Sequence, residues 1–310
     1  MVTRTATTHN NMDDTISQTA KIHRSSKPIS GGQMAAVHFG PIHEPVSLVY
    51  LHANGFNALT YRSLLEPLAK EQNIHVAALD LRGHGRTDLP IDDASLASHT
   101  NYAKDLAAYL HTHIEGRVIL AGHSLGANAA IIATGMLPEK ISRVLAFDPI
   151  VLPLSVRFIM MSGAGRKFLI NNYPFAKNAG RRRDKFASHE AVYKRYHGRG
   201  PFKHFPADVL KDYIFEGFSP IEDGVRLACR PGWEQLGYVS QSQNMKRRIA
   251  NLPPGSRIMI TDFVKQSEAW MGRAQRKNPD LRIDYYPQKD HFFPIIEPDM
   301  SREALQDILD

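Results

Sequence analysis

The pattern Gly-His-Ser-Leu-Gly at residues 122–126, called the elbow below, constrains this chain more than any other short segment. It follows the apolar run 118–121 directly and opens a run of small and apolar residues that extends to residue 137. Gly-x-Ser-x-Gly between a buried strand and a helix is typical of a tight turn whose glycines leave room that a side chain would fill. Such a turn lifts the hydroxyl of Ser124 to the helix N-terminus, where free N–H groups favour negative charge. The elbow therefore predicts a nucleophilic serine.

Short apolar runs alternate with segments of helical periodicity on both sides of the elbow. This alternation is typical of βαβ units and a parallel sheet. In the segment 61–72, for example, Leu64, Leu65 and Leu68 fall on one face of a helix. We expect strands at residues 34–39, 47–51, 74–79, 117–121, 144–147, 257–260 and 282–286, and helices at 61–72, 101–114, 124–137, 268–277 and after residue 301.

The alternation is interrupted once. Residues 151–250 are rich in aromatic, methionine and basic residues and lack the strand pattern, which predicts a mostly helical cap inserted into the sheet domain. Residues 1–33 are polar and predict a flexible tail. We therefore expect an α/β core formed by residues 34–150 and 251–310, with a cap at 151–250.

Composition narrows the class of protein. With 310 residues, 43% hydrophobic and 22% charged, the chain is long enough for one large α/β domain with an insertion. Its single cysteine, Cys229, excludes an intramolecular disulfide and a cysteine-based metal site. No apolar leader or span of about 20 apolar residues occurs, so we expect a cytoplasmic protein without a membrane span. The net charge of +7 is spread along the chain and no nucleic-acid motif accompanies it, so we expect no nucleic-acid partner.

Three further segments, together with the elbow, resemble the α/β-hydrolase superfamily. Leu-His-Ala-Asn-Gly-Phe at residues 51–56 is similar to the family's oxyanion loop, and residues 79–87 are similar to its Asp-x-Arg-Gly-x-Gly-x-Ser segment. Asp-His-Phe-Phe-Pro at residues 290–294 follows the last strand, where the family keeps its catalytic histidine. The resemblance covers the chain from residue 34 onward. It implies the α/β-hydrolase fold, with a mostly parallel central sheet flanked by helices.

Acyl transfer needs a base for the serine and two N–H donors for the oxyanion. His291, in the last of these segments, is the predicted base, and His123 and His84 are its competitors. The backbone N–H of Leu125 is the first predicted oxyanion donor. The resemblance places the second at Asn54, with Gly55 or Phe56 as alternatives if the loop bulges.

The acid that orients His291 has two candidates, because two aspartates end expected parallel strands. Asp148 follows the strand at 144–147 in an arrangement similar to that of some haloalkane dehalogenases, and Asp262 follows the strand at 257–260. In the superfamily the acid more usually follows the later strand, in a Gly-x-x-Asp pattern. That pattern is missing after residue 260, and Lys265 stands near the position where the acid is expected. We predict Asp148, with Asp262 as the alternative.

A serine nucleophile argues against the dehalogenases and epoxide hydrolases of this fold, which use aspartate. We predict a carboxylesterase that cleaves short- to medium-chain esters with an apolar acyl group through an acyl-enzyme, without metal or organic cofactor. Alternatives are a thioesterase, a lactonase, a carbon–carbon bond hydrolase or a non-hydrolytic ligand-binding protein on the same fold. A nucleic-acid or membrane-surface binder that uses the basic cap ranks lower, since it would not need the elbow, base and loop together. Oligomeric state has no signature in the sequence.

Overall fold

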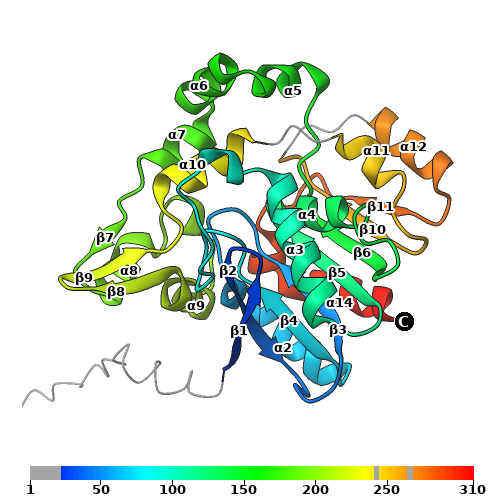
Figure 1. Cartoon of the computed structure of the whole chain (residues 1–310), viewed down its shortest axis with the longest axis horizontal. Helices are drawn as coiled ribbons and strands as arrows, with labels where there is room; N and C mark the ends of the chain where they lie inside the picture. The colour runs from blue at the N-terminus through cyan, green and yellow to red at the C-terminus, as the bar shows by residue number, and fades with distance from the viewer. Residues whose placement is uncertain (1–21, 241–243, 264–267) are drawn as a thin grey trace, which may run out of the picture.

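A computed structural model describes residues 22–240, 244–263 and 268–310. The described residues form a central eight-stranded sheet in the order β1-β2-β4-β3-β5-β6-β10-β11 (Figure 1). Neighbouring strands from β4 to β11 run parallel, and β1 and β2 are antiparallel at one edge. The parallel strands therefore bring their carboxyl ends to one side of the sheet, where such folds place their sites. The strands are β1 His23–Ile29, β2 Gly32–Phe39, β3 Val46–Leu51, β4 His75–Leu79, β5 Val118–His123, β6 Ile141–Phe147, β10 Arg257–Ile260 and β11 Arg282–Tyr285.

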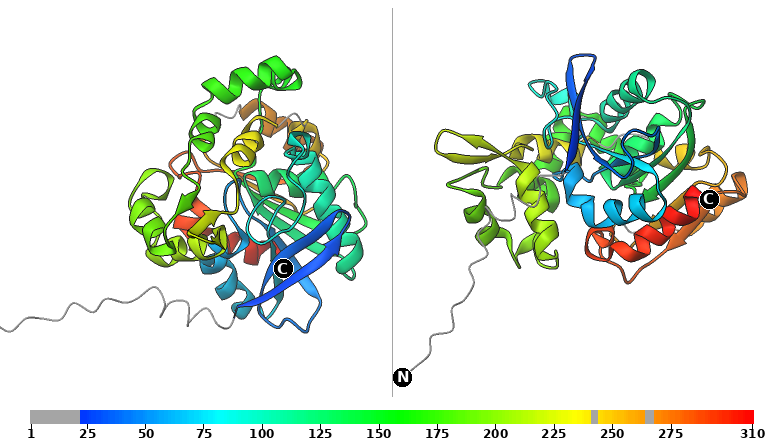
Figure 2. Two further views of the ribbon diagram at one scale, coloured as in Figure 1. Left: turned by 60° about the vertical axis from the view of Figure 1, so that its left-hand side comes forward. Right: turned by 90° about the horizontal axis from the view of Figure 1, so that it is seen from below.

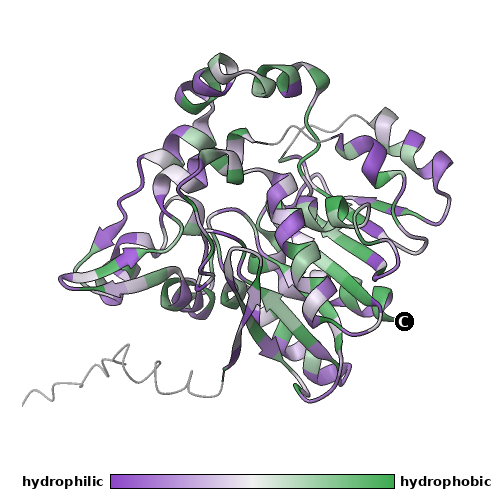
Figure 3. Ribbon diagram, viewed as in Figure 1, coloured by the Kyte–Doolittle hydropathy of each residue, from purple (hydrophilic) through white to green (hydrophobic). Residues whose placement is uncertain are grey.

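Both faces of the sheet are buried. Successive residues of a strand point to opposite faces, so Val49 and Leu51 of β3 join one apolar cluster while Leu48 and Tyr50 join the other. Figure 3 shows the resulting apolar strands at the centre of the core. Helices cover each face, and the right-hand view of Figure 2 shows α2 and α14 on the side opposite to α3. One face carries α3 His99–His113, α4 Leu125–Ala133 and α12 Glu268–Lys277, and the other carries α2 Arg62–Glu71 and α14 Pro298–Leu309.

The strands and helices expected in the core occur, with differences at their ends. The strand at 257–260 and the helix at 268–277 match to the residue. Helix α4 is shorter than expected and ends at Ala133, since the chain then turns at Gly135, whose N–H bonds the carbonyl of Ile132.

The expected tail boundary at residue 33 is wrong. Residues 23–29 form β1, which pairs antiparallel with β2 from His23 opposite His38 to Ile29 opposite Gly32. The strand was missed because it lies at the sheet edge with half-exposed or exposed residues, and so carries a polar rather than an apolar pattern.

Residues 151–250 come between β6 and β10 in the chain, and the described ones among them lie beside and above the carboxyl ends of the parallel strands (Figure 1). Their described part is mostly helical, as expected. It also contains a small antiparallel sheet in the order β7-β9-β8, which the sequence analysis did not predict. Its short strands sit among aromatic and basic residues that mask the alternation. The elements are α5 Leu154–Met161, α6 Gly163–Asn172, α7 Pro174–Gly180, β7 Lys185–Phe186, α8 His189–Tyr196, α9 Ala207–Gly217, β8 Phe218–Ile221, β9 Gly224–Leu227, α10 Pro231–Val239 and α11 Met245–Ile249.

The helices are short. The longest in the described residues, α3, has 15 residues. Across that part of the chain, no helix combines the length and the apolar character needed to cross a membrane.

Candidate active site

Ser124 lies between β5 and α4 with φ of 55° and ψ of −110°, a conformation that non-glycine residues rarely adopt. Glycine is required on both sides of it. A Cβ on Gly122 would lie 2.6 Å from the carbonyl carbon of Gly126, and a Cβ on Gly126 would lie 2.2 Å from the backbone oxygen of Leu51. The tight strand-to-helix turn therefore forms only because the residues two positions before and after Ser124 lack a side chain.

The strained turn places Ser124 at the N-terminus of α4. Leu125 is the first residue of that helix, so its N–H has no intrahelical carbonyl to bond. The side chain of Ser124 is not used as a helix cap, and the residue is 8% exposed. A hydroxyl and an N–H donor thus lie next to each other at the carboxyl end of β5.

The loop after β3 offers the N–H of Asn54. Neighbouring N–H groups are already bonded: that of Ala53 to the Tyr61 hydroxyl at 3.1 Å, that of Gly55 to His84 Nε2 at 3.0 Å and that of Phe56 to the Ala53 carbonyl at 3.2 Å. No acceptor for the N–H of Asn54 lies within hydrogen-bonding distance among the residues that the structure describes. Of the three donors considered from the sequence, Asn54 is therefore the one left free for a ligand.

His291 follows β11 and meets Asp148, which follows β6. The Nδ1 atom of His291 lies 2.6 Å from Oδ2 of Asp148, and both side chains are buried. A carboxylate oxygen is an acceptor, so Nδ1 carries the proton and Nε2 is left as the basic nitrogen. The described residues thus join two of the predicted site residues directly.

Thr261 holds the Asp148 carboxylate in place. Its N–H donates to Oδ1 at 2.9 Å, and its hydroxyl donates to Oδ2 at 2.5 Å. Asp148 has a positive φ of 47°, and its own N–H bonds the carbonyl of Met259. Three donors therefore converge on one buried carboxylate. The sequence analysis missed Thr261, and the only signal for it was its position at the end of β10, beside the competing aspartate.

Asp262 lies elsewhere. Its side chain is exposed and accepts a hydrogen bond from the hydroxyl of Tyr285, and no contact to His291 occurs in the described part of the chain. Lys265, the other residue weighed at this strand end, lies outside the described residues.

His123, one competing histidine, supports the loop that carries His291. Its Nε2 donates to the backbone carbonyl of His291 at 2.8 Å, and its Nδ1 accepts from the hydroxyl of Tyr61 at 2.7 Å. Burial lowers the pKa of His123 well below its usual value. With both ring nitrogens bonded and the ring neutral, His123 positions its neighbours. Tyr61 is a second residue that the sequence analysis missed, because it comes from a distant segment.

His84, the other competitor, is likewise occupied. Its Nδ1 donates to the carbonyl of Arg82 at 2.9 Å, and its Nε2 accepts from the N–H of Gly55. Burial lowers the pKa of His84 to about 4. The ring therefore holds the loop beside Asn54.

Two phenylalanines enclose His291. The ring of Phe263 stacks on the imidazole, with centroids 3.7 Å apart and planes 15° apart. The ring of Phe292 lies 5.4 Å from His291 and 6.2 Å from His123. These contacts keep water from much of the imidazole surface and fix the plane of the ring.

A cavity of about 640 Å³ adjoins this region. Phe56, which follows the Asn54 loop, and Phe292 form part of its wall, and the rest comes from residues 175–238. Its size suits a small organic ligand. Within the described residues, no group of three or more His, Cys, Asp or Glu side chains is placed to hold a metal ion.

Comparison with known proteins gives one family match and several relatives. The profile described as "Alpha/beta hydrolase family" matches residues 48–303. The 2-(acetamidomethylene)succinate hydrolase of Mesorhizobium japonicum is 25% identical over 264 residues, which are 85% of this chain and 87% of that protein.

Two solved structures are also similar. The structure of an E-2-(acetamidomethylene)succinate hydrolase has a TM-score of 0.73 at 21% identity and covers 93% of this chain and 99% of its own. A thioesterase domain from the curacin biosynthetic pathway has a TM-score of 0.70 at 15% identity and covers 93% and 98%. At these sequence identities, the similarity supports the fold and nothing more. The fold class predicted from the sequence is confirmed.

Proposed function

The chain belongs to the alpha/beta hydrolase family, and on that premise we propose that it is a serine hydrolase acting on carboxylic esters of short to medium chain length. Ser124 is the proposed nucleophile, His291 the base and Asp148 the acid. The observation that carries the proposal is the 2.6 Å contact between His291 and Asp148, which leaves Nε2 of the imidazole free to take a proton.

The proposed mechanism has two halves. His291 Nε2 takes the proton of Ser124 as its oxygen attacks the acyl carbon, and then returns that proton to the departing alcohol. Asp148 holds the imidazole in the required tautomer and stabilises its charged form. Water then repeats the sequence against the acyl-enzyme and releases the acid.

The oxyanion of each tetrahedral intermediate is assigned to two backbone donors, Leu125 and Asn54. Leu125 contributes the N–H at the start of α4, and Asn54 contributes the loop N–H for which the described residues provide no acceptor. Donors fixed in advance act without reorganisation, and removing one typically costs about 10²- to 10³-fold in kcat.

We also assign residues 34–150 and 251–310 to the catalytic core and residues 151–250 to a cap over it. The cavity wall supports this assignment, because most of it comes from that inserted segment.

A second candidate is hydrolysis of an amide-type acyl bond. The match to 2-(acetamidomethylene)succinate hydrolase, over 85% of this chain, favours it. The same residues would serve, since the acyl-enzyme steps differ only in the leaving group.

Steady-state assays on a matched panel test the proposal. We expect purified protein to hydrolyse 4-nitrophenyl acetate, butyrate, hexanoate and octanoate, with the largest kcat/KM at short to medium length and little activity on 4-nitroanilides. Ser124→Ala measures the background. Preferential turnover of the anilides would favour the second candidate. No turnover of esters, thioesters or amides above the Ser124→Ala level would reject the hydrolase assignment.

A further inference from the structure

The wall of the cavity is rich in arginine. Arg181, Arg182, Arg183, Arg195 and Arg199 line it, with Glu234 as the one carboxylate among the lining residues. Five guanidinium groups and one carboxylate leave an excess of four positive charges around one cavity. Such a concentration of charge raises the local concentration of anions.

Two of these arginines form hydrogen bonds with other residues of the protein. Arg182 donates to Glu234 Oε2 at 2.5 Å and to the hydroxyl of Tyr213 at 2.6 Å, so its charge is matched. Arg183 donates to the carbonyl of Lys185 at 2.7 Å and lies 4.7 Å from the ring centre of Phe186. Arg182 is thus structural, and the guanidinium of Arg183 is held in one orientation.

The other three arginines differ from Arg182 in their ion pairing. In the part of the chain that the structure describes, no carboxylate lies within ion-pair distance of Arg181, Arg195 or Arg199. Arg195 is on α8, Arg199 follows that helix and Arg181 follows α7. Their side chains therefore reach one cavity from two separate segments, with their donors available to a ligand.

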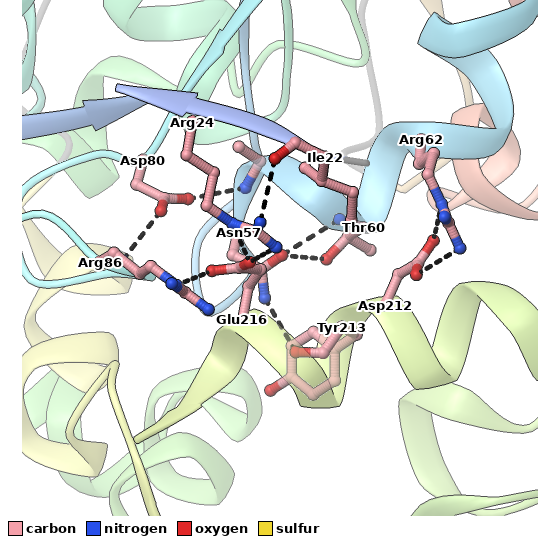
Figure 4. Close-up of polar contacts among 11 residues, drawn as sticks. Ile22, Arg24, Asn57, Thr60, Arg62, Asp80, Arg86, Asp212, Tyr213 and Glu216 are labelled. Atoms are coloured by element: carbon pink, nitrogen blue, oxygen red, sulfur yellow. Dashed lines mark hydrogen bonds and ion pairs between the residues drawn. The ribbon is translucent and has the colours of Figure 1, made fainter. Parts of the chain in front are cut away.

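Helix α9, which packs beside the part of the inserted segment that carries the arginines, is held to the core by the polar contacts that Figure 4 shows. Arg62 of α2 forms a bidentate pair with Asp212, at 2.8 and 2.7 Å, and Asn57 donates to the backbone oxygen of Tyr213 at 2.9 Å. The hydroxyl of that same Tyr213 accepts from Arg182. One turn further along α9, buried Glu216 meets Arg24 and Arg86 (Figure 4). Helix α9 is therefore fixed to the core, and with it the Tyr213 hydroxyl that accepts from Arg182.

The cavity ends beside the proposed site: the catalytic residues do not line it, but two residues close to them in sequence do. Phe56 and Phe292 belong to its wall, and the two rings lie 5.5 Å apart. Phe292 is the residue after His291, and Phe56 closes the loop that carries Asn54. A substrate whose acyl carbon is at Ser124 would pass these rings before it meets the arginines.

We propose that the cavity selects acyl groups that end in a carboxylate, with Arg195 and Arg199 as binding residues for that carboxylate. The aromatic side chains would contact the apolar part of the acyl chain, and the guanidinium groups would donate charge-assisted hydrogen bonds to its far end. This inference rests on the proposed function, because it assigns the substrate class of the same site.

A pair of esters that differ only in that charge tests the inference. The 4-nitrophenyl monoester of adipate has a free carboxylate, and its methyl ester is neutral. We expect kcat/KM to be about tenfold or more higher for the free carboxylate, since one charge-assisted hydrogen bond is worth that much. In the double variant Arg195→Gln/Arg199→Gln this ratio should fall to near one.

Arg166→Gln is the matched control, because Arg166 is exposed on the same inserted segment but does not line the cavity. It should leave the ratio as in the wild type, and thermal melting checks that each variant folds. An equal fall in Arg166→Gln would show a general effect of charge and overturn the assignment. A wild-type ratio near one would overturn the inference while leaving ester hydrolysis intact.

Calorimetric titration of the Ser124→Ala variant with adipate covers the case in which neither ester is hydrolysed. Saturable binding that is lost when Arg195→Gln/Arg199→Gln is added would uphold the carboxylate site although the proposed function had failed. Absence of binding would overturn the carboxylate site as well as the proposed function.

Discussion

Asp148→Asn is the substitution that most sharply tests how the site is arranged. In the wild-type protein, Oδ2 of Asp148 accepts both the Nδ1 proton of His291 and the hydroxyl proton of Thr261. Asparagine keeps Oδ1 as an acceptor for the N–H of Thr261 but places an amide donor where Oδ2 was. The imidazole must then turn its Nδ1 into an acceptor and carry its proton on Nε2. In that tautomer it cannot take the proton of Ser124.

The expected loss is about 10⁴-fold in kcat, the size found where an orienting aspartate becomes asparagine. It corresponds to about 5.4 kcal/mol of transition-state stabilisation at 1.36 kcal/mol per tenfold. Asp262→Asn is the matched control, since its carboxylate is exposed and bonded to Tyr285. We expect it to change kcat by less than about threefold, within the range of ordinary surface substitutions.

Initial rates with 4-nitrophenyl butyrate, with thermal melting to confirm folding, measure both variants. A large loss in Asp262→Asn with near-normal rates in Asp148→Asn would refute the assignment of the acid. Equal losses would mean that the two carboxylates act as one network around His291.

Three further outcomes are expected. Thr261→Val removes one charge-assisted hydrogen bond to Asp148 and should lower kcat by about tenfold to a hundredfold. Thr261→Ser keeps the hydroxyl and should have a kcat close to that of the wild type. Equal rates in both variants would contradict the role of the Thr261 hydroxyl. Gly126→Ala puts a methyl group 2.2 Å from a backbone oxygen of β3 and should destabilise the protein by about 3 kcal/mol in thermal denaturation. Gly135→Ala is the control and should be tolerated, because its new Cβ would be 3.4 Å or more from its neighbours. Burial raises the pKa of Asp80 from 3.8 to about 7, so folding favours its protonated form and the contribution of this group to stability is lost as the pH rises toward 7. Asp80→Asn has no such proton, so its deficit in unfolding free energy relative to the wild type should shrink by up to about 3 kcal/mol between pH 5 and pH 8; a constant deficit in chemical denaturation would contradict this.

The parallel core could be predicted because its determinants are local. Strand β10 contains the short apolar run 258–260, and helix α12 carries Trp270, Met271 and Ala274 at helical spacing. The edge strand β1 could not be predicted from the sequence, since only its pairing with β2 shows that this polar segment is a strand. The small sheet β7-β9-β8 was not predicted for the same reason, because its strands have only two to four residues and are defined by their pairing partners.

The candidate site shows the same division. The elbow around Ser124 consists of consecutive residues between an apolar run and a helical run, so its turn was predictable from that local pattern. The prediction of Asp148 over Asp262 came from a resemblance and not from a local pattern, because both aspartates follow neighbouring parallel strands. The Asp148 side chain is held by Thr261, which donates to it twice. Long-range partners of this kind leave no spacing in a single sequence.

Labelling of Ser124 by a fluorophosphonate probe tests the central claim most directly. Such probes phosphonylate a serine only where a base activates its hydroxyl. The account predicts stoichiometric labelling of the wild-type protein, with the adduct mapped by mass spectrometry to the peptide that contains Ser124. It also predicts no labelling of Ser124→Ala, together with a loss of ester turnover on the order of 10⁶-fold. A folded wild-type protein that resists the probe, or an adduct on another serine that persists in Ser124→Ala, would contradict it.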